Sequence, residues 1–149
     1  MPDSTLSGHA ATLRLYGRRK GKRLRPKMRL LLDTALNAVR VDLTQLPCPF
    51  DPRTLFDPPV HDVWLEIGFG AGEHLAAQAK AHPKVGFIGA DIFENGIASL
   101  LRHCNEGKLA NVRIFYDDAR ALIPALAPAS LSRVFLPYPD PWPKRRHSK

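Results

Sequence analysis

The chain has 149 residues and a formal net charge of +8, which suit a single domain with a polyanionic partner. Its two cysteines, Cys48 and Cys104, have neither zinc-site spacing nor the look of a disulfide framework, so they fit a reducing compartment. No apolar stretch is long enough for a membrane span, and no signal peptide is expected. Composition therefore predicts a soluble, cytoplasmic protein without a metal site.

The first segment is strongly basic. Residues 1–30 hold nine Lys and Arg against one acid, whereas residues 31–143 hold nine basic and thirteen acidic groups. The stretch "GRRKGKRLRPK" (17–27) has too little apolar surface to fold alone. A transit peptide has a similar composition, but the sequence favours a nucleic-acid-binding arm. We therefore expect residues 1–25 to form a flexible basic arm.

Residues 26–60 are expected to hold one helix and a proline-rich connector. Pro26 suits the first turn of a helix. Apolar residues then recur at helical spacing to about Val39. Residues 46–59 contain five of the fourteen prolines, so this stretch is expected to be irregular.

From residue 61 onward the sequence alternates between strand and helix patterns. Apolar strands are predicted at 63–68, 85–91, 112–119 and 132–139, with helices at 73–81 and from about 94 to 105 and a short helical stretch after the third strand. This order predicts an α/β domain over 61–149, with a doubly wound, Rossmann-like parallel sheet. Ligands of such sheets bind at the carboxyl ends of the strands.

The first strand ends in "EIGFGAGE", where Gly68, Gly70 and Gly72 allow a sharp turn and a close approach of a ligand to the backbone. The dinucleotide fingerprint GxGxxG is not met, because Glu73 stands at its last position. Glu66 adds a second carboxylate, which disfavours a pyrophosphate. The turn therefore favours S-adenosylmethionine, which carries a sulfonium and an ammonium group, over NAD.

Carboxylates also follow the next two strands. Asp91 stands at the end of the second strand, where a carboxylate can accept hydrogen bonds from both ribose hydroxyls of an adenosyl group. Asp117 or Asp118, after the third strand, can accept from the adenine amino group. Each of these residues also suits a helix N-cap. Their occurrence at successive strand ends beside a glycine turn favours the cofactor interpretation.

The chain ends in "VFLPYPDPWPKRRHSK", where Asp140 lies between two prolines that hold its backbone stiffly. Tyr138 and Trp142 offer faces on which a base can stack. Cations for phosphate contacts follow at Lys144, Arg145, Arg146 and Lys149. This combination indicates a nucleobase pocket in which Trp142, Lys144 and Arg146 bind substrate. The alternative is a proline-rich turn with a solvated basic tail.

Four motifs in this order carry a resemblance: "LEIGFGAGEHL", "FIGADIFENG", "DDA" and "FLPYPDPWPKRRHSK". Together they resemble the bacterial tRNA (guanine-N7-)-methyltransferase family, over essentially the whole chain. The resemblance implies a class I S-adenosylmethionine-dependent enzyme that methylates guanosine 46 in the tRNA variable loop. By position, it implies that Glu66, Asp91, Asp118 and Asp140 contact or flank the cofactor. It further implies that Asp140 is catalytic and that Lys144 meets the tRNA.

The chain departs from the family pattern at three points. Asp91 replaces the usual glutamate, and Pro137 replaces a bulkier apolar residue. The family also continues well past its RH-x-K segment, so we expect a truncated chain that lacks the C-terminal strands. The alternatives are a non-catalytic RNA-binding module, or a class I methyltransferase that acts on another RNA base. His74 and His103 are expected on helix surfaces.

Overall fold

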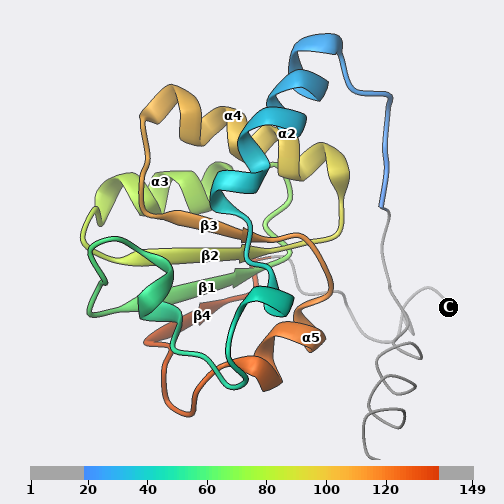
Figure 1. Cartoon of the computed structure of the whole chain (residues 1–149). Coiled ribbons are helices and arrows are strands. Elements are labelled where there is room, and N and C mark those ends of the chain that lie inside the picture. The colour runs from blue at the N-terminus through green and yellow to red at the C-terminus, as the bar shows by residue number, and fades with distance from the viewer. Residues whose placement is uncertain (1–18, 138–149) are drawn as a thin grey trace, which may run out of the picture.

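The computed structural model describes residues 19–137, which form a four-stranded sheet with helices on both faces (Figure 1). The spatial order is β3-β2-β1-β4, and all neighbouring pairs are parallel. The strands are β1 (Val63–Ile67), β2 (Gly86–Ala90), β3 (Val112–Phe115) and β4 (Arg133–Phe135). The predicted α/β class and parallel sheet are confirmed, although each strand is shorter than its apolar run.

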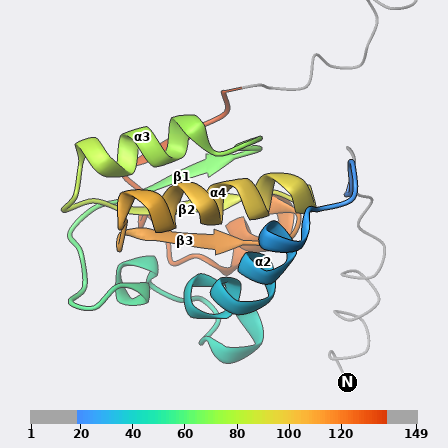
Figure 2. The ribbon, with the colours of Figure 1, turned by 90° about the horizontal axis from the view of Figure 1, so that it is seen from above.

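Three helices cover one face of the sheet, as Figure 2 shows from above. They are α2 (Pro26–Val39), α3 (Glu73–Ala81) and α4 (Glu94–Gly107). The other face carries α5 (Ala119–Leu122) and the 3-10 turns Leu43–Gln45, Pro52–Leu55 and Ile123–Ala125. Proline stands at the start of α2, as its fixed φ and missing N–H predict.

Each face of the sheet has its own apolar core, because side chains alternate along the strands. Under α2, α3 and α4, residues such as Leu36, Leu75 and Leu100 pack on Phe87 of β2. On the other face, Leu122 and Leu126 pack on Leu65 of β1 and Ile88 of β2. The two cores hold the strands in register and so fix where their carboxyl ends lie.

The proline-rich connector is irregular, as predicted, but it is part of the second core. Phe50 and Phe56 are buried at 3% and 5% exposure. The Phe50 N–H donates to the Ala125 carbonyl at 2.9 Å, and the Ala127 N–H donates to the Phe50 carbonyl at 2.8 Å. The connector therefore covers a face of the sheet that would otherwise expose apolar surface.

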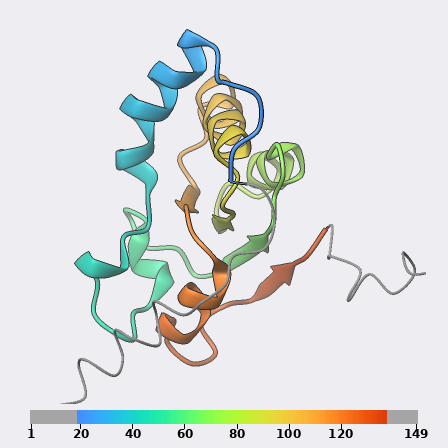
Figure 3. The ribbon, with the colours of Figure 1, turned by 90° about the vertical axis from the view of Figure 1, so that its right-hand side faces the viewer.

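The two edges of the sheet differ. At the β3 edge, the Val41 N–H donates to the Ile114 carbonyl at 2.8 Å, so the chain after α2 covers that edge. β4, red in Figure 3, pairs only with β1 among the described residues. Val134 of β4 is 49% exposed, and Leu136 just after the strand is 54% exposed. Within residues 19–137, no helix combines the length and the apolar character needed to cross a membrane.

Candidate functional site

The turn between β1 and α3 lies at the carboxyl edge of the sheet. Gly68, Gly70 and Gly72 have φ angles of +72°, +63° and +89°, in the left-handed region that favours glycine. A Cβ atom at Gly68 or Gly70 would meet no atom within 4 Å. The turn therefore presents bare backbone to open space, as a close-lying ligand requires.

Glu66 of β1 lies under this turn and is 2% exposed. Its Oε1 lies 2.6 Å from Nδ1 of His74, while its buried Oε2 has no hydrogen-bond partner among the described residues. Burial raises the pKa of Glu66, and the His74 contact opposes that rise. The site thus holds a buried carboxylate with one acceptor atom still unused.

His74 is the partner that the sequence did not predict. Its side chain is 41% exposed on α3, as expected for a helix-surface residue, yet it pairs with the buried Glu66. The His74 ring also contacts Phe135 of β4, with ring centroids 5.3 Å apart. A histidine in the first turn of a helix, just after a glycine turn that follows an acidic strand end, was the available sequence signal.

Asp91 follows β2 and connects the glycine turn to the start of α4. Its Oδ2 accepts from the Gly70 N–H at 3.2 Å. Its Oδ1 accepts from the Ile92 and Phe93 N–H groups at 2.7 and 3.3 Å. The N-cap of α4 is Phe93, so Asp91 is not itself the cap. A carboxylate offers about four acceptor positions, so Asp91 keeps capacity for a further donor.

Asp118 lies beyond β3 and is the N-cap of α5, the alternative that the sequence left open. Its Oδ1 accepts from the Arg120 N–H at 2.8 Å, and its Oδ2 pairs with the Arg120 guanidinium at 2.6 Å. Hydrogen bonding from the Arg120 side chain lowers the pKa of Asp118. The neighbouring Asp117 is exposed and accepts from the Asp118 N–H at 2.7 Å.

Gly96 of α4 is a site residue that sequence reasoning missed. A Cβ atom built there would overlap the carbonyl oxygen of Gly70, so α4 touches the glycine turn through bare backbone. A glycine inside a helical pattern was the available signal, since it usually marks close packing. Gly96 therefore helps to fix the conformation of the glycine turn.

The structure brings together at one edge of the sheet the predicted residues Glu66, Gly68, Gly70, Gly72 and Asp91. Among the other predicted residues, Asp118 lies beyond β3 as the N-cap of α5. The rest lie outside the described residues: Asp140, Trp142, Lys144 and Arg146. Across residues 19–137, no group of three or more His, Cys, Asp or Glu side chains is arranged to hold a metal ion.

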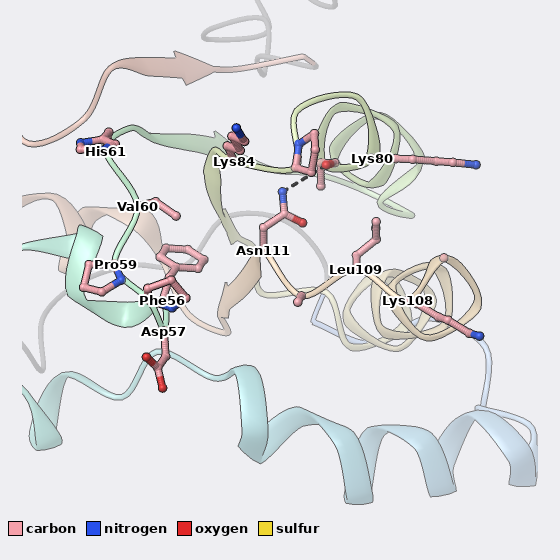
Figure 4. Close-up of a pocket in the computed structure, with 15 residues that line it drawn as sticks. Phe56, Asp57, Pro59, Val60, His61, Lys80, Lys84, Lys108, Leu109 and Asn111 are labelled. Carbon is pink, nitrogen blue, oxygen red and sulfur yellow. Dashed lines mark hydrogen bonds between the residues drawn. The ribbon is translucent and has the colours of Figure 1, made fainter.

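A separate cavity of about 650 Å³ lies at the opposite, amino edge of the sheet (Figure 4). Asn111 closes one side of it by donating to the Ala79, His82 and Val85 carbonyls at 2.9–3.1 Å. The side chains of Lys80 and Lys108 extend away from the cavity (Figure 4). Because ligands of parallel sheets bind at the carboxyl edge, this cavity is not the predicted site.

Comparison with known proteins gives consistent matches. A family model described as "Putative methyltransferase" matches residues 61–149. The chain is 50% identical over 138 residues to a tRNA (guanine-N(7)-)-methyltransferase of Rhodospirillum rubrum, covering 91% of this chain and 54% of that protein. Proteins of the same name from Paramagnetospirillum magneticum and Caulobacter sp. are 47% and 49% identical, over 95% and 92% of this chain.

The chain spans 61% and 58% of the length of those two relatives. The family match takes in more than half of the chain, including the glycine turn, Asp91 and the C-terminal motif. The chain therefore belongs to this methyltransferase family, as its resemblance implied.

Proposed function

We propose that the whole protein is a cytoplasmic S-adenosylmethionine-dependent tRNA (guanine-N7-)-methyltransferase that modifies guanosine 46 of the variable loop. The observation that carries the proposal is the glycine turn flanked by the carboxylates of Glu66 and Asp91, in a chain about half identical to proteins of that name. This arrangement combines open backbone with two acidic acceptors, which suits a cationic adenosyl ligand.

The described residues fit S-adenosylmethionine by the chemistry of their donor and acceptor groups. Oε2 of Glu66 has no hydrogen-bond partner within residues 19–137, and as an acceptor it suits an ammonium group. Asp91 retains acceptor capacity for ribose hydroxyls, although it already organises the turn. Gly68 and Gly70 leave open space beside the backbone. When bound, the cofactor supplies an electrophilic methyl group on a sulfonium.

Asp140 is proposed as the catalytic residue. Guanine N7 carries a lone pair and no proton, so a general base is not needed to expose the nucleophile. Methyl transfer leaves positive charge on the guanine ring, and an ionised carboxylate stabilises that charge. Asp140 can also accept from the guanine N1–H and N2–H groups. Trp142, Lys144 and Arg146 are proposed to bind the tRNA by stacking and by phosphate contacts.

The proposal is tested by measuring the transfer of labelled methyl groups to an unmodified tRNA transcript. Because the chain spans 54% of the Rhodospirillum rubrum relative, the assay uses the chain joined to the part of that relative that follows the matched stretch. We expect incorporation with a transcript that carries guanosine at position 46. A transcript with 7-deazaguanosine there lacks the acceptor nitrogen and should take up no label.

Two controls separate the alternatives. Asp140→Ala should lose turnover while calorimetry shows largely unchanged S-adenosylmethionine affinity, and NAD should not bind. Label that persists with the 7-deaza transcript would assign the activity to another base. A chimera that binds the cofactor and tRNA without transferring methyl groups would favour the non-catalytic RNA-binding function.

A further inference from the structure

The described end of the basic arm is held against the protein. We refer to residues 19–25 as the basic segment. Five of its seven residues are basic and exposed, and none of them forms an ion pair with a carboxylate in the described part of the chain. These side chains are Arg19, Lys20, Lys22, Arg23 and Arg25. The sequence predicted a flexible segment, so the contacts that hold residues 19–25 against the protein need an explanation.

The anchor of the basic segment uses only its backbone. Asn95 of α4 accepts from the Gly21 N–H through Oδ1 at 2.7 Å and donates from Nδ2 to the Lys22 carbonyl at 2.6 Å. The Glu94 N–H donates to the Arg19 carbonyl at 2.7 Å. One asparagine amide thus satisfies a donor and an acceptor of the segment, and the cationic side chains stay available.

Gly21 lets the segment approach α4 this closely. A Cβ atom at Gly21 would lie 2.9 Å from Cζ of Phe93 and 3.3 Å from Oδ1 of Asn95. Next to this contact, Arg29 of α2 pairs with Glu94 at 3.1 Å and fixes the helix that follows the segment. The docking is therefore specific to the backbone at residues 21 and 22.

The anchor belongs to the same short stretch as the cofactor carboxylate. Asp91 accepts from the Ile92 and Phe93 N–H groups, Asn95 holds the basic segment, and Gly96 packs on the Gly70 carbonyl. Residues 91–96 thus connect the glycine turn on one side to a row of exposed cations on the other. The cations stand beside the edge at which methyl transfer is proposed.

We propose that Asn95 is a positioning residue that docks the basic segment beside the site, so that its cations bind the phosphate backbone of the RNA substrate. This inference rests on the proposed function and names the surface that holds its substrate. Exposed Lys and Arg side chains bind nucleic acid by releasing condensed counterions, which makes the affinity fall as salt rises. A docked segment presents these cations in a fixed place, so less conformational freedom is lost on binding.

The first test is Asn95→Ala in the full chain, with Asn105→Ala as the matched control on the exposed side of the same helix. Hydrogen exchange of the Gly21 amide should become at least about tenfold faster in Asn95→Ala and stay unchanged in the control. Fluorescence anisotropy with an unmodified tRNA transcript should show about tenfold weaker binding. Unchanged protection of Gly21, or faster exchange with unchanged tRNA affinity, would overturn the proposal.

A second test does not depend on how Asn95→Ala folds. Lys20, Lys22 and Arg23 are changed together to glutamine, and the control changes the exposed Lys80, Lys84 and Lys108 at the amino edge. Both variants lose three charges. The first should reduce the slope of log affinity against log salt by about two units, and the control by much less. If both triple variants change the salt dependence of tRNA affinity equally, only the net charge matters for binding. That result would contradict the proposed role of the docked segment.

Asn95→Ala and the triple glutamine variant of the basic segment also form a double-mutant cycle. If Asn95 acts by placing these cations, Asn95→Ala should cost clearly less tRNA affinity in the background of the first triple than in the wild type, because only Arg19 and Arg25 of the segment then remain to be placed. Additive losses would overturn the positioning role. These readouts are binding and exchange, so a failure of guanine-N7 methylation would reject the proposed function and leave the docking result to be judged separately.

Discussion

Glu66 and Asp118 are both carboxylates near strand ends, but their surroundings shift their pKa values in opposite directions. Burial dominates at Glu66 and raises its pKa, whereas hydrogen bonds from Arg120 dominate at Asp118 and lower its pKa. The fold therefore disfavours the charged form of Glu66 and stabilises the charged form of Asp118. Such opposite behaviour fits the proposed role of Glu66 toward a ligand and the N-cap role of Asp118 in α5.

Glu66→Gln should stabilise the fold near neutral pH and weaken the cofactor site. Because the pKa of Glu66 is raised in the folded state, this carboxyl group stabilises the fold fully only at pH values below its unfolded pKa. Its stabilising contribution is lost as the pH rises through the folded pKa. The variant's advantage should therefore grow from acid to neutral pH in urea titrations. S-adenosylmethionine affinity should fall about tenfold, because a charge-assisted contact is lost.

The exposed neighbour Glu73 supplies the control for this prediction. Glu73→Gln removes the same charge at an exposed position beside His74, so it should not reproduce the gain in stability that Glu66→Gln shows near neutral pH. If Glu66→Gln destabilises the protein at pH 7, burial is not the dominant influence on this carboxyl.

Asp118→Ala should cost about 1 kcal/mol at neutral pH, because the N-cap of α5 and the Arg120 ion pair are both lost. Asp118→Asn keeps the cap and should cost less. Because the pKa of Asp118 is lowered, its contribution is present above the unfolded pKa and disappears as pH falls through the folded pKa. Thermal unfolding between pH 7 and pH 2 should show the wild type and Asp118→Asn converging.

The same two variants test the cofactor role implied for Asp118. Unchanged S-adenosylmethionine affinity in Asp118→Asn would leave the residue a structural cap. A loss of affinity at nearly unchanged stability would assign its carboxylate to the ligand.

At the scale of elements, the contact between α4 and the glycine turn controls the shape of the site. Gly96→Ala places a methyl group on the Gly70 carbonyl oxygen, so either the helix or the turn must move. We expect a loss of about 1–3 kcal/mol in the free energy of unfolding and little remaining cofactor binding. Urea unfolding and calorimetry measure the two effects.

Gly107→Ala is the control within the same helix. Gly107 is exposed at the end of α4, where a Cβ atom meets only the flexible Leu109 side chain at 3.3 Å or more. Alanine is the better helix former, so this change should be close to neutral or stabilising. Wild-type cofactor affinity in Gly96→Ala would show that the turn does not depend on α4.

The elements themselves were largely predictable because their patterns are local. Helical spacing after Pro26 gave the bounds of α2, and the glycine turn gave the start of α3 at Glu73. The position of Asp91 at the end of β2 was predictable for the same reason, since it directly follows an apolar strand. Asn95 and Gly96 were not predicted as functional, because their importance depends on contacts with residues 21–22 and 70. Local sequence patterns do not reveal contacts between segments that are far apart in the chain.

At the scale of the whole molecule, the β4 edge is the exposed feature with the clearest consequence. In residues 19–137 its outer side has no pairing strand, and Val134 is 49% exposed. Unpaired, apolar edges associate with other chains. Val134→Lys should therefore raise the concentration at which light scattering detects aggregates, without changing the helices and strands seen by circular dichroism.

Leu30→Lys tests whether the effect belongs to the edge. Leu30 is 63% exposed on α2, so adding a charge there changes the net charge without altering β4. Equal protection by both variants would attribute aggregation to general apolar exposure instead of strand pairing.

The hydrogen bonds that anchor the basic segment to Asn95 also have a consequence for synthesis of the chain. Gly21 precedes Asn95 by 74 residues, so the segment leaves the ribosome well before its anchor is made. At translation rates of about 5–20 residues per second, that interval is about 4–15 s. For that time the exposed cations of residues 19–25 have no docking partner, and the segment reaches its place only after α4 has been synthesised.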